Sequence, residues 1–173
     1  GPGLGKGSNR SGASFDQRGT GFPRARSGSV DIGAVEVGQL IVVNTSASGV
    51  GSLSQAVFDA NAAVGADTIT FDPTVFATLQ SIIPSAEMVI TENLNIVGPE
   101  AQVTISGNLA HRIIRTTGGD TFNFSNLRLL LGSASGSGGA VQLANAGAET
   151  ATFASCVLSF NQASGVGGAL SVN

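Results

Sequence analysis

Hydrolytic or lytic chemistry in this chain would have to begin with its carboxylate side chains. Cleavage of a glycosidic bond needs two carboxylates that flank the bond, and lysis of an acidic polymer needs carboxylates clustered around Ca²⁺ beside a basic residue. From residue 63 onward the acidic residues are widely separated: Asp67, Asp72, Glu87, Glu92, Glu100, Asp120 and Glu149. Because they form no spaced group, we predict no catalytic, cofactor-binding or metal-binding residue and a protein that is not an enzyme.

The basic residues near the middle of the chain offer a second candidate site. His111, Arg112 and Arg115 fall on one predicted strand, and Arg128 follows on a later one. Together they could form a basic site for an anion. The alternative is that they are exposed polar positions beside the inward-facing Ile113, which is the alternation expected of a half-buried strand. We favour this alternative.

Composition excludes several classes of protein. Only 11% of the 173 residues are charged, against roughly 25% in an average globular domain. A single cysteine, Cys156, excludes an internal disulfide and a multi-cysteine metal site. The net charge of −3 does not favour a nucleic-acid partner. No apolar run reaches the ~18 residues of a membrane-spanning helix, so we expect no membrane insertion in this segment.

A repeat of 29 residues occupies the second half of the chain, where "FSNLRLLLGSASGSGGAVQL" (124–143) aligns with "FASCVLSFNQASGVGGALSV" (153–172). Phe124 aligns with Phe153, and the Gly-Gly-Ala at 138–140 aligns with the same tripeptide at 167–169. A fixed period of this length is typical of stacked-repeat folds. Cys156 takes the apolar position of Leu127, so we predict a small buried side chain and not a nucleophile.

Each repeat contains short runs of alternating polarity broken by Gly and Ser, which is the pattern of strands and not of helices. Stacked strand-and-turn coils bury an apolar face that a single coil cannot bury alone. The earlier segments "MVITENLNIVG" and "QVTISGN" look like less regular coils. We therefore predict an all-β fold, a right-handed parallel β-helix, over residues 38–173.

One amphipathic helix is predicted at about residues 52–65. Ser52 is a candidate N-cap with Gln55 three residues later, apolar residues follow at helical spacing, and Gly65 is a candidate stop. After Asp67 the period changes to two. A solenoid exposes unpaired strands and open core at its ends, so we expect this helix to cap the N-terminal end of the first coil.

The same residues resemble a known family. "SLSQAV" (52–57), "ANA" (60–62) and "GADTI" (65–69) are similar to the opening segment of bacterial surface proteins with right-handed parallel β-helix repeats, of the polymorphic outer-membrane-protein and CSLREA-domain types. Ser54 and Gln55 stand where the family motif has an Arg-Glu pair, and Gly51 stands where it has Cys. The resemblance implies an extracellular location at a bacterial cell surface.

Residues 1–37 differ in character from the remainder. They are rich in Gly, Ser and Arg, with five basic and three acidic residues, against three basic and eight acidic residues in 38–173. "DQRGTGFPRARSGSVDIGAVEV" (16–37) resembles the segment that closes a β-helix array in the same proteins. We interpret 1–37 as the closing segment of one β-helix module, with a strand at 30–37, and 38–173 as the opening of the next.

The predicted function is that of a non-catalytic structural or adhesive module of a large secreted bacterial surface protein. The alternative is a β-helix that binds or degrades carbohydrate, but Trp and Tyr, the usual platforms for sugar rings, are absent. The expected partners are copies of the chain or adjacent modules of the same protein, arranged head to tail into a fibre, with host or matrix glycans as further candidates. Separate chains joined through 1–37 and successive modules of one long chain both fit this expectation. The alternative is a soluble monomer whose basic segment 1–37 folds back over its own open end.

Overall fold

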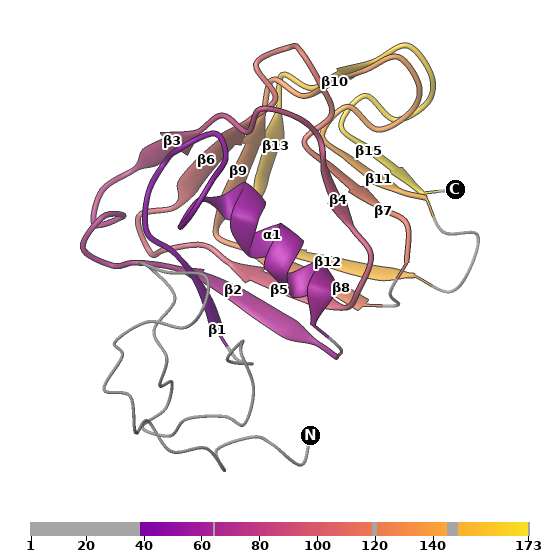
Figure 1. The fold of residues 1–173 in the computed structure, drawn as a ribbon. Helices are drawn as coiled ribbons and strands as arrows, with labels where there is room; N and C mark the ends of the chain where they lie inside the picture. Colours follow the sequence, from indigo (N-terminus) through magenta and orange to yellow (C-terminus); the bar gives the residue numbers. More distant parts are fainter. Residues whose placement is uncertain (1–38, 64, 119–120, 145–148, 173) are drawn as a thin grey trace, which may run out of the picture.

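Short parallel strands wind in the same order through each turn of the chain, and the turns stack into a β-solenoid of about four coils (Figure 1). The computed structural model describes residues 39–63, 65–118, 121–144 and 149–172. The predictions for residues 1–37, including the strand at 30–37, lie outside these residues. The β-helix predicted from the repeat is confirmed.

Each coil gives one strand to each of three sheets. Coil 1 consists of β2 (Asp67–Phe71), β3 (Gln80–Ile82) and β4 (Met88–Ile90), and coil 2 of β5 (Leu94–Val97), β6 (Val103–Ser106) and β7 (Ile114–Thr116). Coil 3 consists of β8 (Thr121–Ser125), β9 (Leu127–Leu130), β10 (Ser133–Ala134) and β11 (Val141–Leu143). Coil 4 repeats this plan with β12 (Thr150–Ala154), β13 (Val157–Ser159), β14 (Gln162–Ala163) and β15 (Leu170–Val172).

The strands of successive coils pair in register, and every pair is parallel. The first sheet has the order β1-β2-β5-β8-β12, the second β3-β6-β9-β13 and the third β4-β7-β11-β15, while β10 and β14 form a small fourth sheet. Between coils 3 and 4 the pairing follows the 29-residue repeat, as in Phe124 with Phe153. Earlier coils are shorter, since Leu94 pairs with Phe122 and Val103 pairs with Leu127.

Side chains that point inward stack in columns through the solenoid. In the first sheet Ile69 pairs with Ile96, Ile96 with Phe124, and Phe124 with Phe153. The rings of the two phenylalanines are stacked with their centroids 5.1 Å apart. Because side chains alternate between the two faces of a strand, one apolar residue in two fills the interior while the residues between them face outward.

The strand β1 (Gln39–Val42) precedes coil 1 and was not predicted as a strand. It pairs in parallel with β2 and buries Leu40 and Val42. It therefore extends the first sheet by one strand beyond the first complete coil.

The predicted helix is α1 (Leu53–Ala62). The Ser52 Oγ accepts a hydrogen bond from the Gln55 backbone N–H at 3.1 Å, which confirms the N-cap. The Gln55 side chain donates to Asp59 at 3.0 Å, so it does not close a capping box. The predicted end at residue 65 was wrong, because the backbone at Ala63 is already extended (φ −90°, ψ 148°).

Helix α1 lies across the N-terminal end of the solenoid (Figure 1). Its buried side chains are Leu53, Ala56, Val57 and Ala60, which join the solenoid core. The helix contacts β1, β2 and β4, so its apolar stripe covers the core at the start of coil 1. The predicted N-terminal cap is thus confirmed at the start of coil 1.

Candidate functional site

A groove runs along one side of the solenoid where the corners of the coils change in length. The corners between the second and third sheets are short in coils 1 and 2, at 83–87 and 107–113. In coils 3 and 4 the corresponding residues 131–140 and 160–169 form two longer loops that project side by side (Figure 1). The space between the short and long corners has a volume of about 690 Å³. It is lined by Glu87, Ala110, His111, Arg112, Ser133, Ala134, Ser135, Gln162, Ala163 and Ser164.

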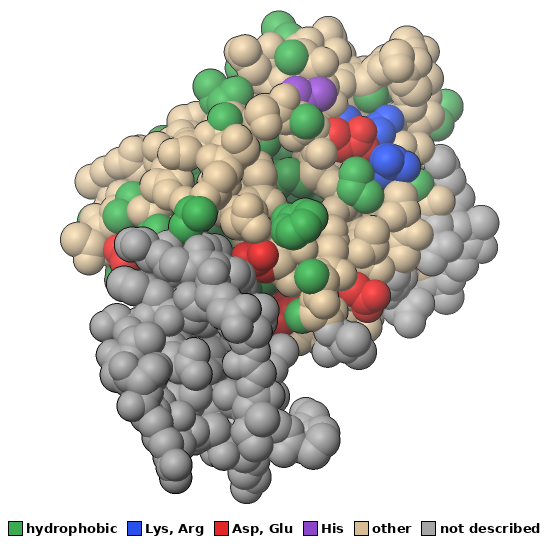
Figure 2. Space-filling view, viewed as in Figure 1, with side chains coloured by type: hydrophobic (Ala, Val, Ile, Leu, Met, Phe, Trp, Pro, Cys, Tyr) green, Lys and Arg blue, Asp and Glu red, His purple; other side chains and the backbone are tan. Residues whose placement is uncertain are grey.

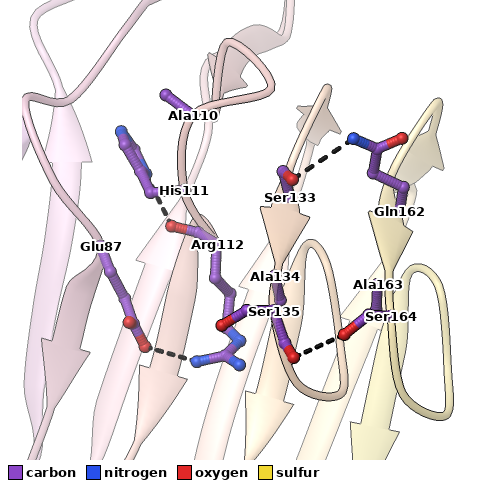
Figure 3. Close-up of a pocket in the computed structure, with 10 residues that line it drawn as sticks. All are labelled: Glu87, Ala110, His111, Arg112, Ser133, Ala134, Ser135, Gln162, Ala163 and Ser164. Atoms are coloured by element: carbon purple, nitrogen blue, oxygen red, sulfur yellow. Dashed lines mark hydrogen bonds and ion pairs between the residues drawn. The ribbon is translucent and has the colours of Figure 1, made fainter.

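Arg112 fastens the long loop of coil 3 to coil 1. Its Nη1 donates to the Glu87 Oε1 at 2.9 Å, its Nε to the Gly138 carbonyl at 2.8 Å and its Nη2 to the Ser137 carbonyl at 2.9 Å. Figure 3 shows the Glu87 carboxylate pointing to the guanidinium. Only 11% of the Arg112 side chain is exposed. The prediction that Arg112 occupies an exposed polar position was therefore wrong.

Arg115 completes an ion-pair cluster around Glu87. It lies in β7, and its Nε donates to the same Oε1 at 2.8 Å with 37% of the side chain exposed. Two guanidinium groups thus face one carboxylate, so the cluster carries a formal charge of +1. The face in Figure 2 is mostly uncharged, and its Arg side chains (blue) gather beside acidic ones (red).

The structure does not bring Arg128 into this cluster. Arg128 lies in β9 of the second sheet, in register with Thr104 and Val157, whereas Arg115 lies in the third sheet. The buried Arg128 Nε has no hydrogen-bond partner among the described residues. A basic site made of all four predicted residues is therefore absent from the described part of the chain.

His111 acts as a link between two coils. Its Nδ1 is 2.7 Å from the Arg112 carbonyl oxygen, and its Nε2 is 3.0 Å from the Pro84 carbonyl oxygen. Both neighbours are acceptors, and a neutral imidazole has only one N–H to offer. Because both ring nitrogens face the protein's own backbone, His111 is poorly placed to act as a base on a ligand. Ile113 is buried, as predicted.

The remaining reactive side chains do not converge on the groove. Among the residues that line it, Glu87 is the one carboxylate, and the described residues hold no group of three potential metal ligands. Cys156 is half-buried against the core, with its Sγ 3.4 Å from the Phe124 and Ala154 carbonyl oxygens. Burial raises the pKa of this thiol, which disfavours the thiolate that a nucleophile requires.

Sequence reasoning missed two residues that matter here, Glu87 and Asn61. Glu87 precedes its partners Arg112 and Arg115 by about one coil length. Asn61, in α1, donates to the Val89 carbonyl at 2.8 Å and accepts from the Thr91 N–H at 2.9 Å, again about one coil away. The signal that could have found both residues is a spacing to their partners close to the length of one coil. It was hidden because the early coils differ in length from the 29-residue period.

The face of coil 4 that points away from coil 3 is the second candidate site. Core positions that are buried in coil 3 are partly or largely exposed in coil 4: Val172 is 66% exposed, whereas its equivalent Leu143 is 3% exposed. Phe160 and Val166 in the corner of coil 4 are 79% and 70% exposed. This apolar face, together with the outer edges of β12, β13, β14 and β15, is the open face of the solenoid.

Comparisons with protein-family models, with curated proteins and with solved structures each find no significant match to this chain. Within the described residues, no helix has the length and apolar character that crossing a membrane would demand.

Proposed function

We propose that this chain is a non-catalytic structural or adhesive module of a large secreted bacterial surface protein, and one link in an extracellular fibre. The proposal draws on the resemblance of residues 16–37 and 52–69 to β-helix surface proteins. The low content of charged residues and the absence of a carboxylate pair in the groove favour a non-catalytic role.

The observation that carries the proposal is the difference between the two ends of the solenoid. Helix α1 covers the core at the N-terminal end, and Asn61 occupies the outer edge of β4. At the other end the open face presents exposed apolar side chains, and no strand in the described part of the chain pairs with the outer edges of β12, β13, β14 and β15. Unpaired strand edges are templates for further pairing, and a head-to-tail contact that does not close into a ring generates a filament.

Light scattering and electron microscopy of the chain test this function. We expect association that increases with concentration, and fibres in the electron micrographs. Val166→Asp should reduce the association, because it places a charge on the open face. The matched control is Val97→Asp, at a 40% exposed position that ends β5 on the side of the solenoid, away from both ends. A monodisperse monomer over a wide concentration range, with no fibres, would exclude assembly from separate chains.

The groove favours a second candidate function, the binding of carbohydrate. Its volume of about 690 Å³ falls within the usual range for a small-molecule site. Ser133, Ser135, Gln162 and Ser164 bring polar groups to it, and Figure 3 shows them on the two adjacent strands β10 and β14 and just after them. An acidic glycan would suit the +1 charge of the Glu87 cluster.

A glycan array and a lyase assay with uronate polymers separate the two functions. The structural function predicts no turnover of any polymer. Retention of an acidic glycan that is weakened by Ser135→Trp, which fills the groove, would support the carbohydrate-binding function. Turnover of a uronate polymer would overturn the non-catalytic proposal.

A further inference from the structure

Within the residues that the structure describes, no coil covers the open face of coil 4 as coil 4 covers coil 3. Val141 and Leu143 of coil 3 are buried under Leu170 and Val172 of coil 4, whereas no strand among the described residues pairs with the outer edge of β15. The same difference separates the paired phenylalanines, since Phe124 is buried and Phe153 is only half-buried.

The backbone hydrogen bonds show the same difference between coil 3 and coil 4. The N–H groups of Gly138, Gly139 and Ala140 in coil 3 donate to the carbonyl oxygens of the residues 29 positions later, each at 2.9 Å. These acceptors are Gly167, Gly168 and Ala169 of coil 4. The N–H groups of Gly167, Gly168 and Ala169 themselves have no backbone acceptor among the described residues. Coil 4 therefore presents three backbone N–H donors in the spacing that matches the carbonyl groups of a further coil.

Gly168 supplies an independent indication. At its equivalent in coil 3, Gly139, an added Cβ would lie 2.3 Å from the Gln162 carbonyl oxygen and 2.4 Å from the Gly168 carbonyl oxygen, so coil 4 requires glycine there. At Gly168 the nearest atom to an added Cβ is the Asn161 carbonyl oxygen at 3.3 Å, and φ does not require glycine. The described residues thus provide no strong reason for glycine at 168. A coil stacked on coil 4 would provide one.

We propose that the open face of coil 4 is an interaction surface for one further coil of the same 29-residue repeat, stacked in the register that coil 4 keeps on coil 3. The occupant presents backbone carbonyl groups to Gly167, Gly168 and Ala169, and apolar side chains to Phe153, Leu158 and Leu170. Such stacking rests on the proposed function, because it gives the repeat-built module its mode of continuation.

The test lengthens the full chain by a copy of residues 145–173, placed directly after residue 173. We expect a melting temperature several degrees higher than that of the parent chain, and slower hydrogen exchange at residues 167–172. The control carries a scrambled sequence of the same 29 residues, and it should melt like the parent. A copy that raises neither the melting temperature nor the protection would overturn the proposal.

Substitution of the two glycines makes the test specific to the register. Gly139→Ala should lower the melting temperature by several degrees in both the parent and the lengthened chain, because its Cβ meets backbone atoms in each. At a concentration at which the parent is monomeric, Gly168→Ala should be well tolerated in the parent, and as costly as Gly139→Ala in the lengthened chain. An equal effect of Gly168→Ala in both chains would overturn the register. A monomeric parent in light scattering would count against fibre assembly from separate chains and leave this result intact.

Discussion

At the scale of single residues, the side chains that matter most are those that bond to the backbone of a neighbouring coil. Arg112, Asn61 and Asn161 each join a backbone group about one coil away: Arg112 reaches the loop of coil 3, Asn61 the strand β4, and Asn161 the Gly132 N–H at 2.7 Å and the Leu129 carbonyl at 3.0 Å. A buried backbone group without a partner is costly, so these amides and this guanidinium stabilise positions that the ladder of strands leaves unpaired.

Asn61→Ala should destabilise the protein by about 1–2 kcal/mol, because the Val89 carbonyl and the Thr91 N–H lose their side-chain partner at the edge of β4. Chemical denaturation measures the change. The matched control is Gln55→Ala, which removes a bond within the same helix and should cost only about 0.2–0.5 kcal/mol. Equal effects of the two substitutions would show that Asn61 does not protect the strand edge.

The hydrogen bonds of the Asp72 carboxylate predict that the free energy of unfolding depends on pH. Its Oδ1 accepts from the Val75 N–H at 3.0 Å and the Thr74 N–H at 2.8 Å, and these bonds hold its pKa below the ordinary value of 3.8. Because the folded-state pKa is lowered, the carboxylate stabilises the fold above pH 3.8, and this contribution is lost as the pH falls through the folded-state pKa. The turn positions Phe76, which is buried edge-on against Phe71 at 5.0 Å.

Unfolding free energies of the parent and of Asp72→Asn, measured from neutral pH down to acid, test this contribution. The asparagine keeps an acceptor oxygen but does not titrate, so the two curves should converge as the pH falls below 3.8. Curves that run parallel over the whole range would show that Asp72 does not contribute in this way.

At the scale of elements, helix α1 determines which end of the solenoid is closed. Leu53→Asp or Val57→Asp would bury an unpaired charge in the core or displace the cap, so we expect a loss of several kcal/mol in thermal melts. Phe58→Asp on the exposed face of the same helix should change stability little. Melting temperatures of Leu53→Asp and Val57→Asp equal to that of the parent would show that the cap is dispensable.

The elements also show how far the sequence alone could lead. The pairing of coils 3 and 4 was predicted residue by residue, because Phe124 and Phe153 occupy equal positions in coils of equal length. The strand β1 was missed because a single run of four residues, Gln39–Val42, has no partner in the repeat. The groove was missed because it depends on corners of unequal length, and the Glu87 cluster because its partners lie 25 and 28 residues away.

At the scale of the whole molecule, contacts between neighbouring coils dominate, so stability should decrease toward the open face. In dilute solution, where the chain is monomeric, we expect hydrogen exchange to be faster in residues 149–172 than in residues 94–130, since among the described residues only coil 3 covers coil 4. Mass spectrometry of peptides from both regions measures the difference. Equal protection in the parent chain would contradict a stability that depends on stacking.

The unequal corners have a consequence for how such a molecule can diversify. The inward columns keep their register, although residues 107–113 in coil 2 correspond to the longer 131–140 in coil 3. A corner can therefore gain or lose residues without any change in the packing of the interior. The groove exists only because a long corner follows a short one, so a single insertion in coil 2 would shift its position along the solenoid. New surface shapes are thus accessible through changes of corner length alone, while the apolar columns keep their register.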